Sequence, residues 1–146
     1  MKPSLLVLVA CSLTATTLCA AKPAPGFRAG AATSVITPPL GRPIVGNFIA
    51  PLSTNVHDEL HARCLVLDDG KTKLALVVLD LLGTDVDMCA ETRSLIEKQV
   101  GIPSANVLIS AVHTHSASSP GGKAPAPAEP EYENYRAFVV QRIVDG

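Results

Sequence analysis

The sequence has little net charge, few aromatic residues and few long apolar runs, and each of these shortages excludes a class of function. Of its 146 residues, 12 are lysine or arginine and 13 are aspartate or glutamate, so it lacks the strongly basic surface that nucleic-acid binding requires. No predicted helix is both basic and amphipathic, which is the usual pattern of helices that lie on a membrane surface. Tryptophan is absent, and there are only two tyrosines and three phenylalanines. We therefore expect no nucleic acid among the partners of this chain.

The first 21 residues have the pattern of a secretory signal peptide. Lys2 gives a positive start, residues 4–18 are apolar, and the small residues CAA at 19–21 offer a cleavage point. The apolar run is shorter than the roughly 20 residues that span a bilayer, so we expect no transmembrane segment after cleavage. The sequence LVAC at residues 8–11 resembles a lipobox, but it lies too close to the start to leave an apolar core. The pattern favours soluble export, to the exterior or the periplasm, over a lipid anchor.

Residues 22–146 remain after cleavage and are enough for one domain with its own core. They keep two of the four cysteines, Cys64 and Cys89. An oxidising compartment would preserve a disulfide between them, and two small buried side chains on different elements are the alternative. No Cys-x-x-Cys spacing is present to hold a metal ion. The distance between the two thiols decides between these readings.

The first half of this domain is predicted to be rich in strands. Residues 28–36 are small and β-branched and stop at a pair of prolines, which predicts a short strand. Residues 40–56 contain several glycines and prolines and are predicted to form a loop. The apolar segments 62–67 and 73–79 flank the turn sequence DDGK, which predicts a hairpin. Residues 74–79 are apolar at every position, as in strands that are covered on both faces.

A helix is predicted to follow this hairpin. Thr84 and Asp87 have the spacing of a capping box at a helix start, and Gly101 followed by Pro103 marks the helix end. The pattern predicts one apolar stripe along this helix, made of Val86, Cys89, Ile96 and Val100.

The sequence after this helix predicts another buried strand at residues 106–112, a long loop at 116–130 and a last helix at 131–144. This helix is predicted to turn four side chains toward a core: Tyr135, Phe138, Val139 and Ile143. The order β-loop-β-β-α-β-loop-α is that of an α/β domain, a sheet with helices packed on it. Because the last helix has nothing after it to pack against, we expect a truncated N-terminal part of a larger catalytic domain.

The strongest candidate site is the sequence VHTHS at residues 112–116, directly after a predicted strand. Open α/β sheets place their ligand crevice at such strand ends. On an extended backbone, side chains two residues apart point the same way, so His113 and His115 are predicted to face one site about 7 Å apart. Neutral imidazoles can bind a metal ion, or one can bind it while the other polarises a substrate oxygen. Two polar loop residues with surface hydrogen bonds are the alternative.

Other polar residues are weaker candidates. His57 and His61 precede the hairpin, and a four-histidine metal site is one reading because catalytic zinc takes about three protein ligands. Polar residues at the start of a strand are common, however. Asp80 ends the strand 73–79 and either faces a cleft or caps the following turn. Asp58 and Arg63 are candidates for a surface ion pair.

Three ordered blocks of sequence resemble the N-terminal catalytic domain of the neutral/alkaline non-lysosomal ceramidases. They are ATSVITPP at residues 32–39 with Gly46 following, VHDELHARCLVL at residues 56–67, and NVLISAVHTHS at residues 106–116. The sequence VVLD at residues 77–80 lies between the second and the third. The likeness covers most of residues 22–146, but only the opening part of the family's domain.

The resemblance implies an α/β domain with one catalytic zinc ion that hydrolyses the N-acyl amide of ceramide, a lipid, to a sphingoid base and a fatty acid. It makes His113 a zinc ligand, His115 a catalytic residue against the reacting carbonyl of the substrate, and Gly46 part of the substrate's access route. Zinc-bound water ionises near neutral pH and the cation withdraws charge from the amide oxygen, while a neutral histidine can donate to the developing oxyanion.

The chain also departs from the family. The family's further zinc ligands (a histidine, a glutamate and a tyrosine) and its proposed nucleophilic serine lie beyond residue 146, so we expect this chain by itself to be inactive. Ser34 stands where an aspartate that helps to bind a second ion is usual, His61 replaces a common aromatic residue, and residues 117–120 replace a usual Gly-Pro. Two alternatives stay open, which are an exported hydrolase of another amide or ester and a non-catalytic remnant. The sequence does not indicate an oligomeric state.

Overall fold

The structure, a computed structural model, describes residues 26–120 and 130–146, without the side chains of residues 130–134. The predicted signal peptide and most of the predicted loop at 116–130 lie outside the described residues. The elements in chain order are β1 (Arg28–Val35), β2 (His61–Asp68), β3 (Lys73–Leu79), α1 (Val86–Val100), a 3-10 turn (Ser104–Asn106), β4 (Val107–Ala111) and α2 (Pro130–Asp145). This order confirms the predicted α/β class. Within the described ranges, no helix has the length and apolar character needed to cross a bilayer.

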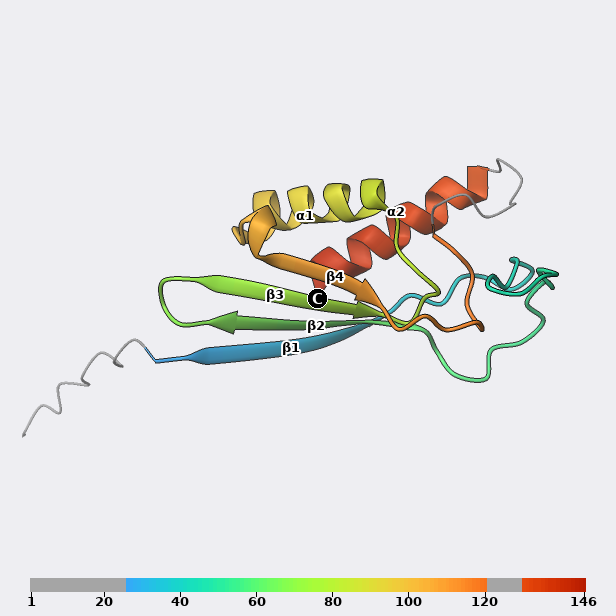
Figure 1. Cartoon of the computed structure of the whole chain (residues 1–146), viewed down its shortest axis with the longest axis horizontal. Helices are drawn as coiled ribbons and strands as arrows, with labels where there is room; N and C mark the ends of the chain where they lie inside the picture. The colour runs from blue at the N-terminus through green and yellow to red at the C-terminus, as the bar shows by residue number, and fades with distance from the viewer. Residues whose placement is uncertain (1–25, 121–129) are drawn as a thin grey trace, which may run out of the picture.

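The four strands form one sheet in the order β1-β2-β3-β4 (Figure 1). β2 pairs antiparallel with β1 and β3, and β3 pairs parallel with β4. The predicted hairpin is thus confirmed, with its turn closed by Asp69, whose side chain accepts from the N–H groups of Lys71 and Thr72. A parallel pair needs a crossover, and α1 supplies it. In the sheet formed by the described residues, β4 is one edge, with the uncharged sequence VLISA.

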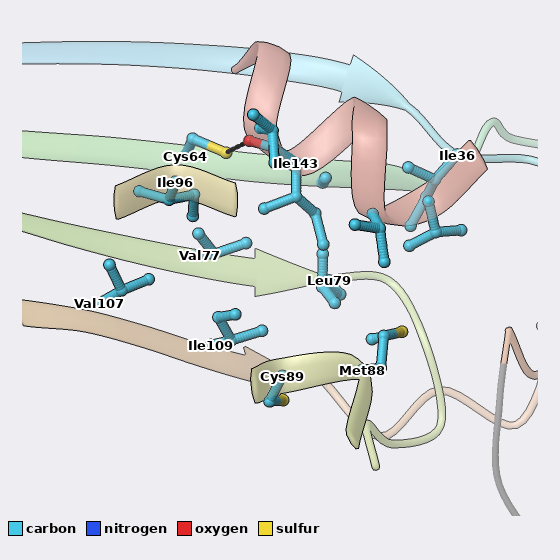
Figure 2. Packing of buried hydrophobic residues seen from close by; sticks show 14 of the residues in the cluster. Ile36, Cys64, Val77, Leu79, Met88, Cys89, Ile96, Val107, Ile109 and Ile143 are labelled. Carbon is cyan, nitrogen blue, oxygen red and sulfur yellow. Dashed lines mark hydrogen bonds between the residues drawn. The ribbon is translucent and has the colours of Figure 1, made fainter. Parts of the chain in front are cut away.

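Both helices lie on the same face of the sheet, and the core lies between them and the strands (Figures 1 and 2). The sheet contributes alternate buried side chains, because residues two apart share a face. Burying each large apolar side chain stabilises the fold by roughly 1.5–3 kcal/mol. The buried residues of β2, β3 and β4 are Ala62, Cys64, Ala75, Val77, Leu79, Val107 and Ile109.

The opposite face of the sheet is open among the described residues. Leu65 on β2, Leu74 and Val78 on β3, and Leu108 on β4 are all exposed. The prediction that residues 74–79 are covered on both faces is therefore wrong for this part of the chain. The apolar side chains on the second face of β3 lack the second layer that such a pattern normally indicates.

Helix α1 starts one residue later than the capping-box pattern predicts. Its N-cap is Asp85, whose side chain accepts a hydrogen bond of 2.7 Å from the N–H of Met88. Gly101 ends the helix as predicted, with a φ of 75° and its N–H directed to the carbonyls of Ile96 and Glu97. Asp is as good an N-cap as Thr, so the sequence did not distinguish the two.

The buried side of α1 also differs from the predicted stripe. Val86 and Val100, at its two ends, are exposed, whereas the buried residues are Met88, Cys89, Thr92 and Ile96. Thr92 can be buried because its hydroxyl donates to the carbonyl of Met88 at 2.7 Å, which satisfies the polar group. The predicted stripe omitted Met88 and this threonine.

Helix α2 packs through side chains spaced four residues apart. Tyr135, Val139 and Ile143 are buried as predicted, and the hydroxyl of Tyr135 donates to the carbonyl of Ile36 at 2.8 Å. Phe138, also predicted to face the core, is exposed. Its ring stacks on that of Tyr135 with centroids 6.5 Å apart, because position 138 lies at the border of the packed face.

Both cysteines are buried free thiols. Cys64 lies on β2 with its sulfur 3.7 Å from the carbonyl oxygen of Ile143, and Cys89 lies on α1 beside Met88 (Figure 2). The structure therefore supports two small buried side chains and not the disulfide. Burial raises the pKa of the Cys64 thiol, which keeps it protonated and unreactive.

Candidate functional site

The histidine pair lies just beyond β4, at the end of the sheet where the chain also leaves β3 (Figure 1). The backbone stays attached to the segment that follows β3, because the N–H of Val112 donates to Leu79 at 3.0 Å and that of Thr114 to Leu81 at 3.2 Å. His113 has a φ of 65°, which is in the left-handed region that a side chain makes costly. The prediction of an extended backbone is therefore wrong at this residue.

The two imidazoles nevertheless meet. Their ring centroids lie 5.1 Å apart with an angle of 78° between the ring planes, so the edge of one ring faces the other. Both side chains are exposed. The left-handed turn at His113 thus brings the rings together by a different geometry from the one that the spacing suggested.

The tautomer of His113 follows from its contact with Leu82. The Nδ1 atom lies 2.8 Å from the carbonyl oxygen of Leu82, and a carbonyl can only accept, so Nδ1 carries the proton. The lone pair of the neutral ring is then on Nε2, which is the arrangement that metal-binding histidines commonly have. The sequence analysis did not identify Leu82, because the contact uses its backbone carbonyl and its side chain gives no sign of this role.

Gly46 lies against the second imidazole. A Cβ atom at this position would lie 2.8 Å from Nδ1 of His115 and 3.0 Å from Cδ1 of Leu82, and the residue has a φ of 97°. Both observations require glycine. The N–H of Val45 donates to the carbonyl of Ala117 at 3.0 Å, which ties the loop 40–56 to the chain just after the histidines.

All three residues proposed for the site thus lie together. The ring of His113 meets that of His115, and Gly46 lies against His115, although Gly46 comes from a segment far from the two histidines in the sequence.

A hollow of about 630 Å³ lies beside this cluster, between the loop 40–56, residues 57–60 and the chain after β4. Val112, Thr114 and Ser116 line it, and the two histidines do not. Alternate residues of segment 112–116 therefore face different sides: Val112, Thr114 and Ser116 line the hollow, and the two histidines lie outside it.

Asp80 lines the hollow and organises its floor. It accepts from the backbone N–H of His61 at 3.0 Å and pairs with the guanidinium of Arg63. Of its two predicted roles, the structure supports the cleft-facing one, because Asp80 lines the hollow and its carboxylate bonds to His61 and Arg63 of β2. Asp58 bonds instead to Nδ1 of His57 at 2.7 Å, so the predicted Asp58–Arg63 ion pair is wrong.

The side chains described at residues 26–120 and 135–146 do not form a complete zinc site. No group of three histidine, cysteine, aspartate or glutamate side chains there could hold a metal ion, whereas catalytic zinc takes about three protein ligands. The four-histidine reading is therefore wrong. His113 fits one ligand position through its free Nε2, and further ligands would have to come from outside the described residues.

Comparison with known proteins points to one fold. No protein-family model matches the sequence, and neither does any curated protein. The crystal structure of neutral ceramidase from Pseudomonas aeruginosa is similar, with a TM-score of 0.65 and 20% identity over 84% of this chain and 21% of that chain. A structure described as ceramidase complexed with C2 gives a TM-score of 0.62 and 20% identity over 83% of this chain and 20% of that one.

The chain thus spans about a fifth of the length of the structures it matches. Identity at this level shows the fold alone. The resemblance that the three sequence blocks indicated is confirmed as a likeness of fold to part of a neutral ceramidase.

Proposed function

We propose that this chain is part of a zinc-dependent hydrolase that cleaves the N-acyl amide of ceramide or a related lipid, giving a sphingoid base and a fatty acid. One observation carries the proposal. In a fold shared with neutral ceramidases, the chain brings His113, His115 and Gly46 together at a strand end, and these are the residues that the sequence resemblance assigned to zinc, reacting carbonyl and substrate access.

His113 is the proposed zinc ligand. Its hydrogen bond to Leu82 holds the proton on Nδ1 and leaves Nε2 for the metal. A zinc ion bound there, with ligands from outside the described residues, would lower the pKa of its water and polarise the amide carbonyl. The strained backbone of His113 is consistent with a site residue, since such strain concentrates at functional positions.

His115 is the proposed contact to the reacting carbonyl. Its ring is confined between His113 and Gly46, so it loses little freedom when a substrate is bound. A neutral imidazole held in this way can donate a hydrogen bond to an oxygen on which negative charge develops. Gly46, without a side chain, lets the backbone of the loop 40–56 approach this ring closely.

The test is hydrolysis of ceramide by the protein expressed from its complete reading frame, with and without chelator. We expect release of fatty acid that chelator abolishes and zinc restores. Replacing His115 by alanine should lower kcat by roughly 10²–10⁴-fold, and His113→Ala should abolish zinc-dependent activity. The control is Lys71→Ala, an exposed residue in the β2–β3 turn, at the opposite end of β3 from the histidines.

Chelator-resistant hydrolysis, or no fatty acid from any N-acyl lipid tried, would remove the proposal. Zinc-dependent turnover by the 146-residue chain alone would contradict our expectation that it is inactive, because it would mean that residues 1–146 hold all the ligands.

A further inference from the structure

The loop between β1 and β2 carries the most exposed apolar side chain of the described residues, Phe48, and several other exposed apolar side chains. Phe48 is fully exposed and Ile49 is 82% exposed, and Leu40, Leu52 and Val56 of the same loop are exposed as well. Residues 43–56 contain no charged side chain. Exposed apolar residues that gather in this way usually mark a surface that contacts another molecule or a membrane.

Backbone hydrogen bonds hold the base of this loop. The N–H of Ile44 donates to Pro51 at 2.8 Å, that of Gly41 to Ser53 at 2.8 Å and that of Ser53 to Arg42 at 2.9 Å. Pro43 and Leu52 form an isolated antiparallel bridge. The two arms of the loop are therefore fixed side by side, and the residues between them, 45–50, are presented as a tip.

The tip lies next to the candidate site. Gly46, which touches His115, is two residues before Phe48. In Figure 1 the segment between β1 and β2 projects beyond the end of the molecule at which β3 and β4 stop. The apolar tip and the histidines thus share one end of the domain, so a surface that receives the tip is brought close to the imidazoles.

We propose that this tip, with Phe48 and Ile49 as its anchors, inserts into the interfacial layer of a lipid membrane. The proposal rests on the proposed function, which supplies a lipid substrate. A projecting, uncharged tip can enter an interface without desolvating a charge, which would be costly. Because no basic residue lies in 43–56, attachment depends on apolar burial and does not require anionic lipid.

The absence of tryptophan makes a residue-specific test available. In the 146-residue chain with Phe48→Trp the new residue is the sole tryptophan, and its emission is measured with phosphatidylcholine vesicles that contain no ceramide. We expect a blue shift on adding vesicles and at least twofold quenching by acyl chains brominated near the headgroup. The matched control is Leu108→Trp on the open sheet face, where Leu108 is 56% exposed; its emission should change little.

Three results would overturn the proposal. The first is an unshifted, unquenched emission of Phe48→Trp in the presence of vesicles. The second is equal quenching at positions 48 and 108, which would indicate general adsorption. The third is a blue shift that grows with protein concentration without vesicles, which would mean that a second copy of the chain covers the tip.

A second measurement does not depend on the tryptophan. The double variant F48S/I49S should bind vesicles at least about tenfold more weakly than the unchanged chain, because two large apolar anchors are lost. Val86→Ser removes a side chain that is equally exposed, on α1, and should leave binding unchanged. Neither experiment uses turnover, so loss of the hydrolase proposal and loss of this one are seen separately.

Discussion

The helix-covered face of the sheet and the loop end of the sheet are held together by different means. On the covered face, apolar side chains from three strands and two helices bury one another. At the loop end, exposed histidines are positioned by backbone carbonyls, by a glycine with positive φ and by a short bridge. We therefore expect the covered face to determine the stability of the fold and the loop end to determine the proposed activity. Changes on the covered face should unfold the chain, and changes at the loop end should alter the site while the fold persists.

The largest expected effect tests the two faces of one strand. Leu79 on β3 is fully buried and Leu74 on the same strand is 43% exposed. Leu79→Ala should lower the free energy of unfolding by about 2–5 kcal/mol, whereas Leu74→Ala should cost below about 1 kcal/mol. Urea unfolding followed by circular dichroism measures both. Similar losses would mean that the open face is covered in solution and would end the contrast between the faces.

The second prediction concerns the loop end itself. Gly46→Ala and Gly41→Ala both place a side chain at positive φ, which costs about 1–2 kcal/mol, but only at position 46 would the new methyl meet another group, the ring of His115. Gly46→Ala should therefore be the more destabilising, and NMR signals of His115 should shift in this variant alone. Equal losses and unchanged histidine signals in both variants would mean that the contact at Gly46 is unimportant.

A smaller effect is expected at the start of α1. Asp85→Ala removes the side chain that caps the helix and should cost about 1 kcal/mol. Asp87→Ala, in the first turn but without a capping bond in the structure, should cost only a few tenths through the helix dipole. If the order of the two were reversed, the capping box predicted from Thr84 and Asp87 would be the better description.

The smallest expected effect is a pH dependence at the β2–β3 turn. The N–H groups of Thr72 and Lys71 bond to the Asp69 carboxylate and lower its pKa. A lowered folded-state pKa stabilises the fold above the unfolded value of about 3.9 and the stabilisation is lost as pH falls through the folded value. The urea midpoint should therefore drop between pH 6 and pH 3, and Asp69→Asn should reduce this drop. An unchanged drop would show that other carboxylates cause it.

The covered face was the more predictable of these regions. The β-branched runs and the turn sequence at residues 68–71 gave the hairpin, and Gly101 gave the end of α1, because those residues act through their own backbone preferences. The cap at Asp85 and the burial of Thr92 were missed. Both depend on which polar atom finds a partner after packing, and neighbouring residues could have served equally well.

At the loop end, the residues of the candidate site could be predicted from the sequence, but the geometry that brings them together could not. His113 and His115 were expected to meet because of their spacing, yet an unforeseen left-handed turn brings them together. The carbonyl of Leu82 could not have been found, since every residue has a carbonyl and only the folded chain shows which one is used. Phe48 and Ile49 lie in the predicted loop 40–56, but their exposure and the bridge at the base of the loop could not be predicted from the sequence.

The edge position of β4 has a practical consequence for handling the protein. Natural sheets protect such edges against unwanted strand addition with lysine, proline or a bulge. The sequence VLISA contains neither lysine nor proline. Concentrated samples of the 146-residue chain should therefore lose monodispersity, because β4 strands of different copies can pair. A lysine in place of Leu108, whose side chain already faces solvent, would be the simplest way to keep them in solution.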